Sequence, residues 1–189
     1  MNTKRKKLVI VGDGNCGKTS LLLVFSSDTW EETWEPTVIE NYVANIVVGT
    51  TEVQLCMWDT AGQEDFNHLR TLCYPGADVI LMCFAIDNQV SLHNVWCAWM
   101  PEIEKFCPEV PVILVGTKKD LRDDPGALNL VKTKAAKFMA AEVNAYDYLE
   151  CSAKTKVGVR EVFITAAKAA LFAREERKKR KKNKGCVLL

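Results

Sequence analysis

The sequence predicts an α/β domain with a mostly parallel six-stranded sheet and one antiparallel edge strand, flanked by helices. Three observations predict it. Short apolar runs alternate with longer amphipathic stretches, one pair of runs is joined by a tight turn, and glycine-rich or polar segments directly follow the apolar runs. Alternating β and α patterns are typical of a sheet covered by helices. A length of 189 residues suits one well-buried domain.

Six runs rich in β-formers predict the strands. Five of them do not alternate between apolar and polar residues, which favours strands buried on both faces. These five runs are KLVIVG (7–12), VQLCMW (53–58), DVILMCFAI (78–86), PVILVGT (111–117) and YLECSA (148–153). The sixth run is NYVANIVV (41–48), and Gly49-Thr50-Thr51 joins it to the 53–58 run. This short connection predicts a hairpin and therefore an antiparallel edge strand.

Helical patterns lie between the strands, at 17–25, 91–107, 131–143 and from 157 onward. In the last segment, the apolar residues that recur on one helical face are Val159, Val162, Phe163, Ala166 and Ala170.

The stretch DDPGALNL (123–130) is too short to nucleate a helix, and Pro125-Gly126 favours a turn. We therefore expect one turn or a loop there and no independent helix. The helix expected over 131–143 carries four residues at helical spacing, namely Ala135, Phe138, Met139 and Glu142. Two of these four are expected to be the apolar anchors that hold the helix to the core.

The overall charge is nearly balanced, with 25 Lys+Arg against 24 Asp+Glu, but it is unevenly distributed. Residues 177–184 carry seven positive charges and no negative ones, so the remaining residues are net negative. No stretch approaches the ~20 apolar residues of a membrane span, and the run 8–11 is too short for a signal peptide. Eight cysteines without C-x-x-C or zinc-ligand spacing predict a reducing compartment and buried thiols.

A phosphate-binding loop is predicted directly after the first strand. The segment GDGNCGKT (12–19) satisfies G-x-x-x-x-G-K-[ST], with a strand before it and a helix after it. The glycines let the backbone curl so that N–H groups and the helix N-terminus surround phosphate oxygens. Lys18 would reach the β- and γ-phosphates, and the Thr19 hydroxyl would face Mg²⁺. The alternative is a glycine-rich turn that merely ends a strand, which this context disfavours.

Polar residues also follow three later strands. The third strand ends in DTAGQ (59–63). Asp59 would face the first loop, where its carboxylate could hold the water shell of Mg²⁺. Taken alone, DTAG fits a turn with Asp as a helix cap equally well. The fifth and sixth strands end in TKKD (117–120) and CSAK (151–154). Asp120 would accept hydrogen bonds from the guanine N1–H and exocyclic amine, a donor pair that adenine lacks. The N–H of Ala153 would meet guanine O6.

The set GDGNCGKT, EPT, DTAGQE, TKKD and CSAK resembles the Ras superfamily of small GTPases over nearly the whole chain. Within it, WEPTVIENYVANI, WDTAGQEDF, LMCFAID and KFCPEVPVILVGTKKDLR look like the Rho branch, closer to Rho than to Rac and with a shortened insert region. The resemblance implies the P-loop NTPase fold of small GTPases. It also implies a molecular switch that hydrolyses GTP to GDP, slowly by itself and fast only with an activating protein.

The resemblance further implies roles for matching residues. Thr37 matches the switch threonine that senses Mg²⁺ and the γ-phosphate. Gln63 matches the residue that orients the attacking water, and Gly14 matches the glycine that leaves room for that glutamine. The implied catalytic residues are Gly14, Lys18, Thr37 and Gln63. The implied Mg²⁺ ligands are Thr19, Thr37 and, through water, Asp59. The implied nucleotide-binding residues are Gly12, Asp13, Gly14, Asn15, Cys16, Gly17, Lys18, Thr19, Ser20, Trp30, Thr37, Asp59, Thr60, Ala61, Gly62, Thr117, Lys118, Asp120, Ser152, Ala153 and Lys154.

Several positions qualify the resemblance. Cys16 stands where Rho proteins often carry a redox-sensitive cysteine, although a packing role fits equally well. Neither switch region offers an arginine that could act in cis as the catalytic arginine finger. Four residues depart from the family pattern. Trp30 replaces a phenylalanine that shields the nucleotide, and Trp34 replaces a tyrosine, so chemistry on that hydroxyl does not transfer. Phe66 and His68 replace a tyrosine and an arginine, and regulators that contact those groups should bind differently.

The C-terminal tail, 174–189, follows a nucleotide-binding domain predicted over 1–173. Its last four residues, Cys186 to Leu189, fit a C-a-a-X box, in which a final Leu favours geranylgeranylation of the cysteine. The basic run would supply a second anchoring signal, worth at most about 1 kcal/mol per charge near an anionic leaflet. We therefore expect the cytoplasmic face of the plasma membrane, with a cytosolic pool. A solvated helix end or a nuclear role is the alternative, and no nucleic acid partner is expected.

The partners implied by the resemblance are a guanine nucleotide, exchange factors, GTPase-activating proteins, a dissociation inhibitor, and Rho effectors such as formins or kinases that organise actin. Two other classes stay open. One is a binding module locked with GTP, and Gly14 and Gln63 argue against it. The other is an ATP-using P-loop kinase, and Asp120 argues against that.

Overall fold

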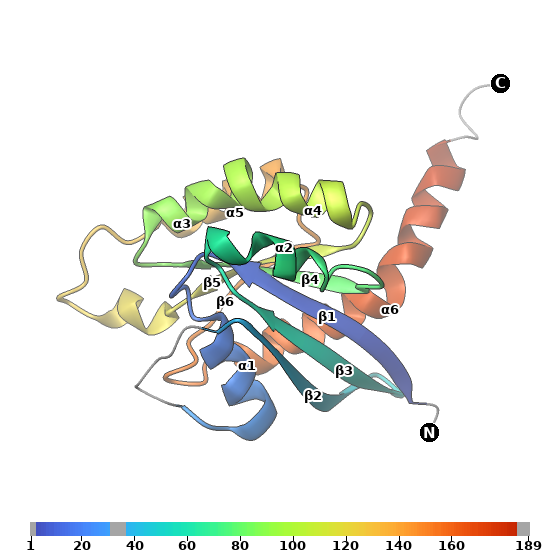
Figure 1. The fold of residues 1–189 in the computed structure, drawn as a ribbon, viewed down its shortest axis with the longest axis horizontal. Coiled ribbons are helices and arrows are strands. Elements are labelled where there is room, and N and C mark those ends of the chain that lie inside the picture. The colour runs from blue at the N-terminus through green and yellow to red at the C-terminus, as the bar shows by residue number, and fades with distance from the viewer. Residues whose placement is uncertain (1–2, 31–36, 185–189) are drawn as a thin grey trace.

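The computed structural model describes residues 3–30 and 37–184; for Glu64 and residues 173–184 it describes only the backbone. Within these residues, six strands form one sheet in the order β2-β3-β1-β4-β5-β6 (Figure 1). In this described part of the chain, the β2–β3 pair is antiparallel and the other four pairs are parallel. The strands are β1 (Lys4–Gly12), β2 (Ile39–Val48), β3 (Thr51–Thr60), β4 (Val79–Ala85), β5 (Val112–Thr117) and β6 (Asp147–Glu150). The predicted fold class is therefore confirmed.

Strands β4 and β5 are buried on both faces, as their unbroken apolar runs predict, whereas β3 buries mainly alternate residues and β6 is only partly buried, so the same prediction is wrong for these two strands. Every residue of β4 is buried. In β1, Leu8 and Ile10 face one core while Val9 and Val11 face the other, because successive side chains of a strand point to opposite sides. The hairpin is also confirmed: Val48 pairs with Thr51 across a two-residue turn.

Helices cover both faces of the sheet (Figure 1). Helices α1 and α6 pack on one face, and α3, α4 and α5 pack on the other. The α-helices are α1 (Lys18–Ser27), α2 (Asn67–Thr71), α3 (Gln89–Asn94), α4 (Met100–Phe106), α5 (Thr133–Glu142) and α6 (Val159–Lys184). Two 3₁₀ segments, η1 (Glu64–Phe66) and η3 (Lys119–Asp123), and one π-helical turn, η2 (Val95–Trp99), complete the set.

The long C-terminal helix buries the predicted apolar face. All five residues expected on that face are buried, namely Val159, Val162, Phe163, Ala166 and Ala170. The ring of Phe163 stacks on that of Phe25 in α1, with the ring centroids 3.7 Å apart. Among the described residues, no helix has both the length and the apolar content needed to cross a membrane.

Helix α5 forms where it is predicted, but only one of the two predicted apolar anchors packs against the core. Phe138 is 66% exposed, and Ala135 is exposed as well. The buried side is turned by about one residue, since Ala136 is fully buried and Val143 is 3% exposed. Met139 packs beside them and is the one apolar member of the predicted set that contacts the core.

The segment between η3 and α5 contains no helix. Residues 124–132 form a turn at Pro125-Gly126 followed by an irregular loop, and no helix forms within the predicted segment after Asp123, as the sequence predicts. The Asp124 carboxylate accepts a hydrogen bond of 2.8 Å from the Gly126 amide. Arg122 donates to the Val131 carbonyl at 3.0 Å, which ties the far end of this loop back to η3.

The strand order determines where a ligand can bind. From β1 the chain moves to β2 and β3 on one side and then crosses to β4 on the other. Chain connections that leave a parallel sheet in opposite directions open a crevice at the carboxyl ends of the strands. The crevice here lies beyond the end of β1, where the glycine-rich loop begins.

Candidate functional site

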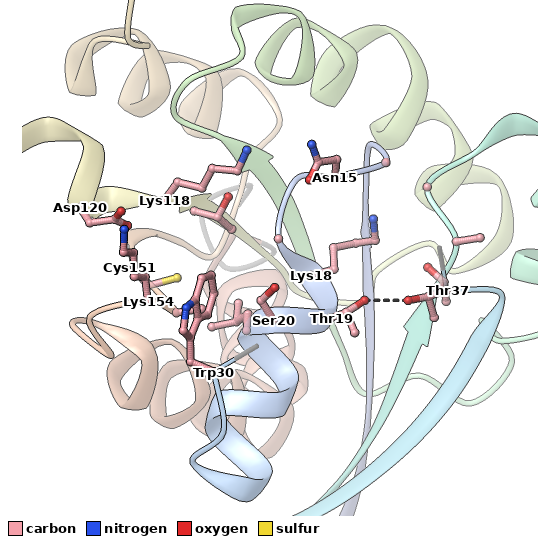
Figure 2. Close-up of a pocket in the computed structure, with 18 of the residues that line it drawn as sticks. Asn15, Lys18, Thr19, Ser20, Trp30, Thr37, Lys118, Asp120, Cys151 and Lys154 are labelled. Atoms are coloured by element: carbon pink, nitrogen blue, oxygen red, sulfur yellow. Dashed lines mark hydrogen bonds between the residues drawn. The ribbon is translucent and has the colours of Figure 1, made fainter. Parts of the chain in front are cut away.

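A cavity of about 280 Å³ opens at the carboxyl ends of the strands. Figure 2 shows Lys18, Thr19 and Thr37 around one end of this cavity and Lys118, Asp120 and Lys154 around the other. Most of the predicted site residues line it, namely Gly14, Asn15, Gly17, Lys18, Thr19, Ser20, Trp30, Thr37, Thr60, Ala61, Gly62, Gln63, Thr117, Lys118, Asp120, Ala153 and Lys154. Leu21, Leu121 and Cys151 also line it; Cys151 belongs to the CSAK motif but is not among the predicted site residues, and Leu21 and Leu121 lie just after motifs without belonging to them.

The glycine-rich loop curls around the Lys18 side chain. Lys18 Nζ donates to the carbonyl oxygens of Gly12 and Asp13, each at 2.8 Å. Glycine is required at Gly12, where φ is 140° and a Cβ would lie 2.2 Å from the Cys83 carbonyl oxygen. Gly17, with φ 84°, turns the chain directly into α1. The loop thus presents an ammonium group and a helix N-terminus to the same space, which suits the phosphates of a nucleotide.

A buried carboxylate and two hydroxyls meet beside the loop. Thr19 Oγ1 donates to Asp59 Oδ2 at 2.6 Å and lies 2.8 Å from Thr37 Oγ1. Asp59 has no solvent exposure, and its Oδ1 has no hydrogen-bond partner among the described residues. Burial raises the pKa of Asp59 to about 6, against the hydrogen bond from Thr19 and the charge of Lys18, which lower it.

This cluster fits a hydrated divalent cation. An unpaired buried carboxylate oxygen is costly unless a ligand supplies its partner. The three side chains offer oxygen atoms only, as Mg²⁺ prefers. Thr19 and Thr37 would coordinate the ion directly, and Asp59 would hold its water shell.

The other end of the cavity carries the Asp120 carboxylate. Ser152 Oγ donates to Asp120 Oδ1 at 2.5 Å, which fixes the orientation of the carboxylate. Lys118 adopts a left-handed conformation, with φ 60°, and pairs with Asp87 at 3.1 Å. The Ser152 side chain is buried behind Asp120 and does not line the cavity, so its part is to support the carboxylate.

Thr117 connects the two ends of the site. Its Oγ1 donates to the Cys16 carbonyl at 2.6 Å and also contacts the Phe84 carbonyl at 3.1 Å. A hydroxyl at the end of β5 therefore ties the base-side loop to the phosphate-side loop. Thr117 therefore has a structural role that does not require contact with a ligand.

The DTAGQ segment packs tightly against the glycine-rich loop. A Cβ at Gly62 would lie 2.4 Å from the Gly14 amide nitrogen and from the Asp13 carbonyl carbon. A Cβ at Gly14 would lie 3.9 Å from Gln63 Cγ. Gln63 itself is exposed at the rim of the cavity. The two glycines thus let Gln63 stand directly beside the loop that would hold the terminal phosphate.

Some predicted residues are placed differently from the rest. Cys16 is 1% exposed and does not line the cavity, and burial raises the pKa of its thiol, which favours a packing role over redox sensitivity. The Asp13 side chain points away toward α3 and η2. Trp30 lines the cavity and is 40% exposed. Trp34 and Cys186 lie outside the described residues.

Comparison with known proteins agrees with this geometry. A family model described as the Ras family matches residues 7–172. The match begins inside β1 and ends in α6, so it includes every loop that lines the cavity. The chain belongs to the Ras family of guanine-nucleotide-binding switch proteins.

Proposed function

We propose that this protein is a Rho-type GTPase switch that cycles between GTP and GDP and signals, when anchored to a membrane, to effectors that organise actin. One observation carries the proposal: the lysine loop, the Thr19 side chain, which is bonded to the buried Asp59, and the Asp120 carboxylate line a single cavity. The first two suit phosphates and a divalent cation, and the third suits guanine. The Rho-like sequence motifs support the finer assignment.

The chain's own residues divide the chemistry of GTP hydrolysis among them. Lys18 and the N-terminus of α1 bind the β- and γ-phosphates, and Gln63 orients the attacking water. Thr19, Thr37 and, through water, Asp59 would hold Mg²⁺, which would supply positive charge to neutralise the phosphates. Asp120 and the Ala153 amide bind the base.

Fast hydrolysis requires help from another protein. The one arginine of the 60–76 region, Arg70, is only 3% exposed and is bound to Glu102, so it does not reach the phosphates. An arginine supplied by an activating protein typically accelerates this chemistry by about 10³–10⁵-fold. We therefore expect slow intrinsic turnover.

The switch regions are 27–42 and 60–76. The Ala61 amide donates to the Val38 carbonyl at 3.1 Å, and Thr37 lies against Thr19. Two segments far apart in the sequence thus meet beside the start of α1, next to the loop that would hold the γ-phosphate. Segments ordered by γ-phosphate and Mg²⁺ relax after hydrolysis, which changes the surface that partners read.

Partners would read the exposed edge of the sheet next to these segments. Strand β2 is the edge strand, and Glu40 and Asn41 at its start are exposed. Exchange factors, activating proteins, a dissociation inhibitor, and formin- or kinase-type effectors are the expected partners. Because 124–132 forms no helix, effectors that require the Rho insert helix should bind weakly.

Membrane anchoring would depend on Cys186. Replacing Cys186 with serine removes the thiol to which a prenyl group is attached, and the basic run alone should not hold the protein at an anionic leaflet. We expect the variant to shift from the membrane fraction to the cytosol in cell fractionation and imaging. Cys97→Ser, at an exposed cysteine of η2, is the matched control and should stay at the membrane. A Cys186→Ser variant that remained on membranes would refute the two-signal anchor.

Single-turnover hydrolysis of GTP by the purified chain tests the switch itself. We expect slow conversion to GDP that requires Mg²⁺. Stable GTP with no conversion would instead indicate a GTP-locked binding module.

A further inference from the structure

The Asp13 carboxylate is bound by two side chains from outside the cavity. Trp99 Nε1 donates to Asp13 Oδ1 at 2.7 Å, and Asn94 Nδ2 donates to Asp13 Oδ2 at 2.7 Å. Trp99 is 5% exposed, so its indole N–H has little access to water. The glycine-rich loop is therefore held from behind by the α3–η2 segment through both carboxylate oxygens.

A π-helical turn makes this double contact possible. Asn94 and Trp99 are five residues apart, and in a regular α-helix they would point about 140° away from each other. In η2 the Met100 amide bonds to the Val95 carbonyl, an i to i+5 bond that widens the turn. The widened turn brings positions five apart onto the same side of the helix. Pro101 follows directly, and a proline disfavours the regular α-helical bonding pattern over the preceding turn.

Trp99 also contacts an arginine of the 60–76 region. The Arg70 guanidinium lies over the Trp99 ring, 4.5 Å from its centroid. Arg70 forms two 2.8 Å bonds with the Glu102 carboxylate, and Tyr74 donates to that same carboxylate. Stacking, the ion pair and burial together leave Arg70 little freedom to move.

The held arginine reaches the segment that carries Gln63. Arg70 Nη1 donates to the Ala61 carbonyl at 2.8 Å. On its other side, Gly62 packs against the backbone of Asp13 and Gly14 with no room for a Cβ. The backbone just before Gln63 is thus fixed from one side by Arg70 and from the other by the glycine-rich loop.

We propose that Trp99 is a positioning residue for GTP hydrolysis, which aligns the glycine-rich loop with Gln63 by bonding Asp13 and stacking on Arg70. This inference rests on the proposed function, because it concerns the alignment of water and γ-phosphate. Trp99 touches neither the nucleotide pocket nor Gln63 and acts through its two neighbours. Misplacement of reacting groups by about 1 Å can lower a rate by about 10²-fold, so a rigid link between the two loops matters.

Trp99→Phe isolates the hydrogen bond. Phenylalanine keeps an aromatic ring beneath Arg70 but removes the N–H that Asp13 accepts. We expect the single-turnover hydrolysis rate to fall about tenfold or more, because the glycine-rich loop would no longer be held in line with Gln63. The rate of GDP dissociation should change by less than about twofold, because Lys18, Thr19 and Asp120 are unaltered. A merely structural role would instead shift the melting temperature and both rates together.

Trp96→Phe is the matched control. It makes the same substitution in the same π-helical turn, but Trp96 is 52% exposed and has no part in the link. Its hydrolysis rate should stay within about twofold of wild type. Equal hydrolysis rates for Trp99→Phe and Trp96→Phe would overturn the inference while leaving the proposed function intact.

Arg70→Lys provides a second route if Trp99→Phe is poorly folded. Lysine keeps the charge but lacks the planar group that bonds Glu102 twice and Ala61 at once. Slower hydrolysis with unchanged GDP dissociation would support the link, and unchanged hydrolysis would overturn it. A wild-type chain that binds GTP but never hydrolyses it would overturn the proposed function, and the positioning role with it.

Discussion

Asp120→Asn should convert a guanine-selective protein into one that prefers xanthine nucleotides. The Asp120 carboxylate would accept two hydrogen bonds from guanine, and an amide places a donor where the exocyclic amine of guanine also donates. Xanthine carries a carbonyl at that position, which the amide can bond. Losing two charge-assisted bonds of about 1.5–3 kcal/mol each predicts GTP binding weaker by roughly 10²–10⁴-fold. Competition between GTP and XTP for a fluorescent nucleotide measures both changes.

The matched control is Asp123→Asn, which changes the same chemical group three residues away at an exposed position. This control should leave GTP affinity within about twofold of wild type. Ser152 can still donate to an amide oxygen at position 120, so the local fold should survive the test substitution. Asp120→Asn protein that still bound GTP tightly and ignored XTP would show that Asp120 does not read the base.

Gln63→Leu should separate GTP binding from GTP hydrolysis. Leucine fills a similar volume but cannot orient water, so the single-turnover rate should fall roughly tenfold to a hundredfold. GTP affinity should stay within about twofold, because Lys18 and Asp120 are untouched and Gln63 stands at the exposed rim. Quenched single-turnover assays with separate affinity measurements give the two values.

Gln89→Leu serves as the control for Gln63→Leu. Gln89 begins α3 and donates to the Asn129 carbonyl, outside the cavity. Its hydrolysis rate should match that of wild type. Normal turnover by Gln63→Leu would remove Gln63 from the proposed mechanism.

The centre of the sheet could be predicted well because β4 and β5 are unbroken apolar runs. Residues buried on both faces leave no alternation to misread, and β4 is buried throughout. Only the strand boundaries moved: β1 begins at Lys4 rather than residue 7, and β6 spans 147–150 rather than 148–153. Backbone pairing extends β1 past its apolar residues and ends β6 before residues 151–153, and periodicity does not report such pairing.

The packing face of α5 could not be predicted for a different reason. Alanines stand on both candidate faces, so the contrast between apolar and polar positions is small. Phe138 is the largest apolar residue of the segment, yet the sheet beneath accommodates the smaller Ala136. The shape of the facing surface decided the outcome, and that shape is set by distant strands.

The residues that line the cavity could be predicted from sequence motifs, whereas the contacts that support them could not. Each lining loop carries a local pattern that can be read in a few residues. The hydrogen bond from Trp99 to Asp13 joins residues 86 positions apart, and no local sequence pattern predicts it. Pro101 inside a helical stretch was the one available signal of an irregular turn.

The central claim, that the cavity binds a guanine nucleotide with Mg²⁺, is tested most directly by the nucleotide that co-purifies with the protein. The chain should be expressed in full, purified in Mg²⁺, denatured, and the released nucleotide separated by ion-exchange chromatography. The geometry at Lys18, Asp59 and Asp120 predicts about one GDP or GTP per chain. Chelation of Mg²⁺ should release this nucleotide before the protein is denatured. ATP in its place, or no nucleotide at all, would contradict the account.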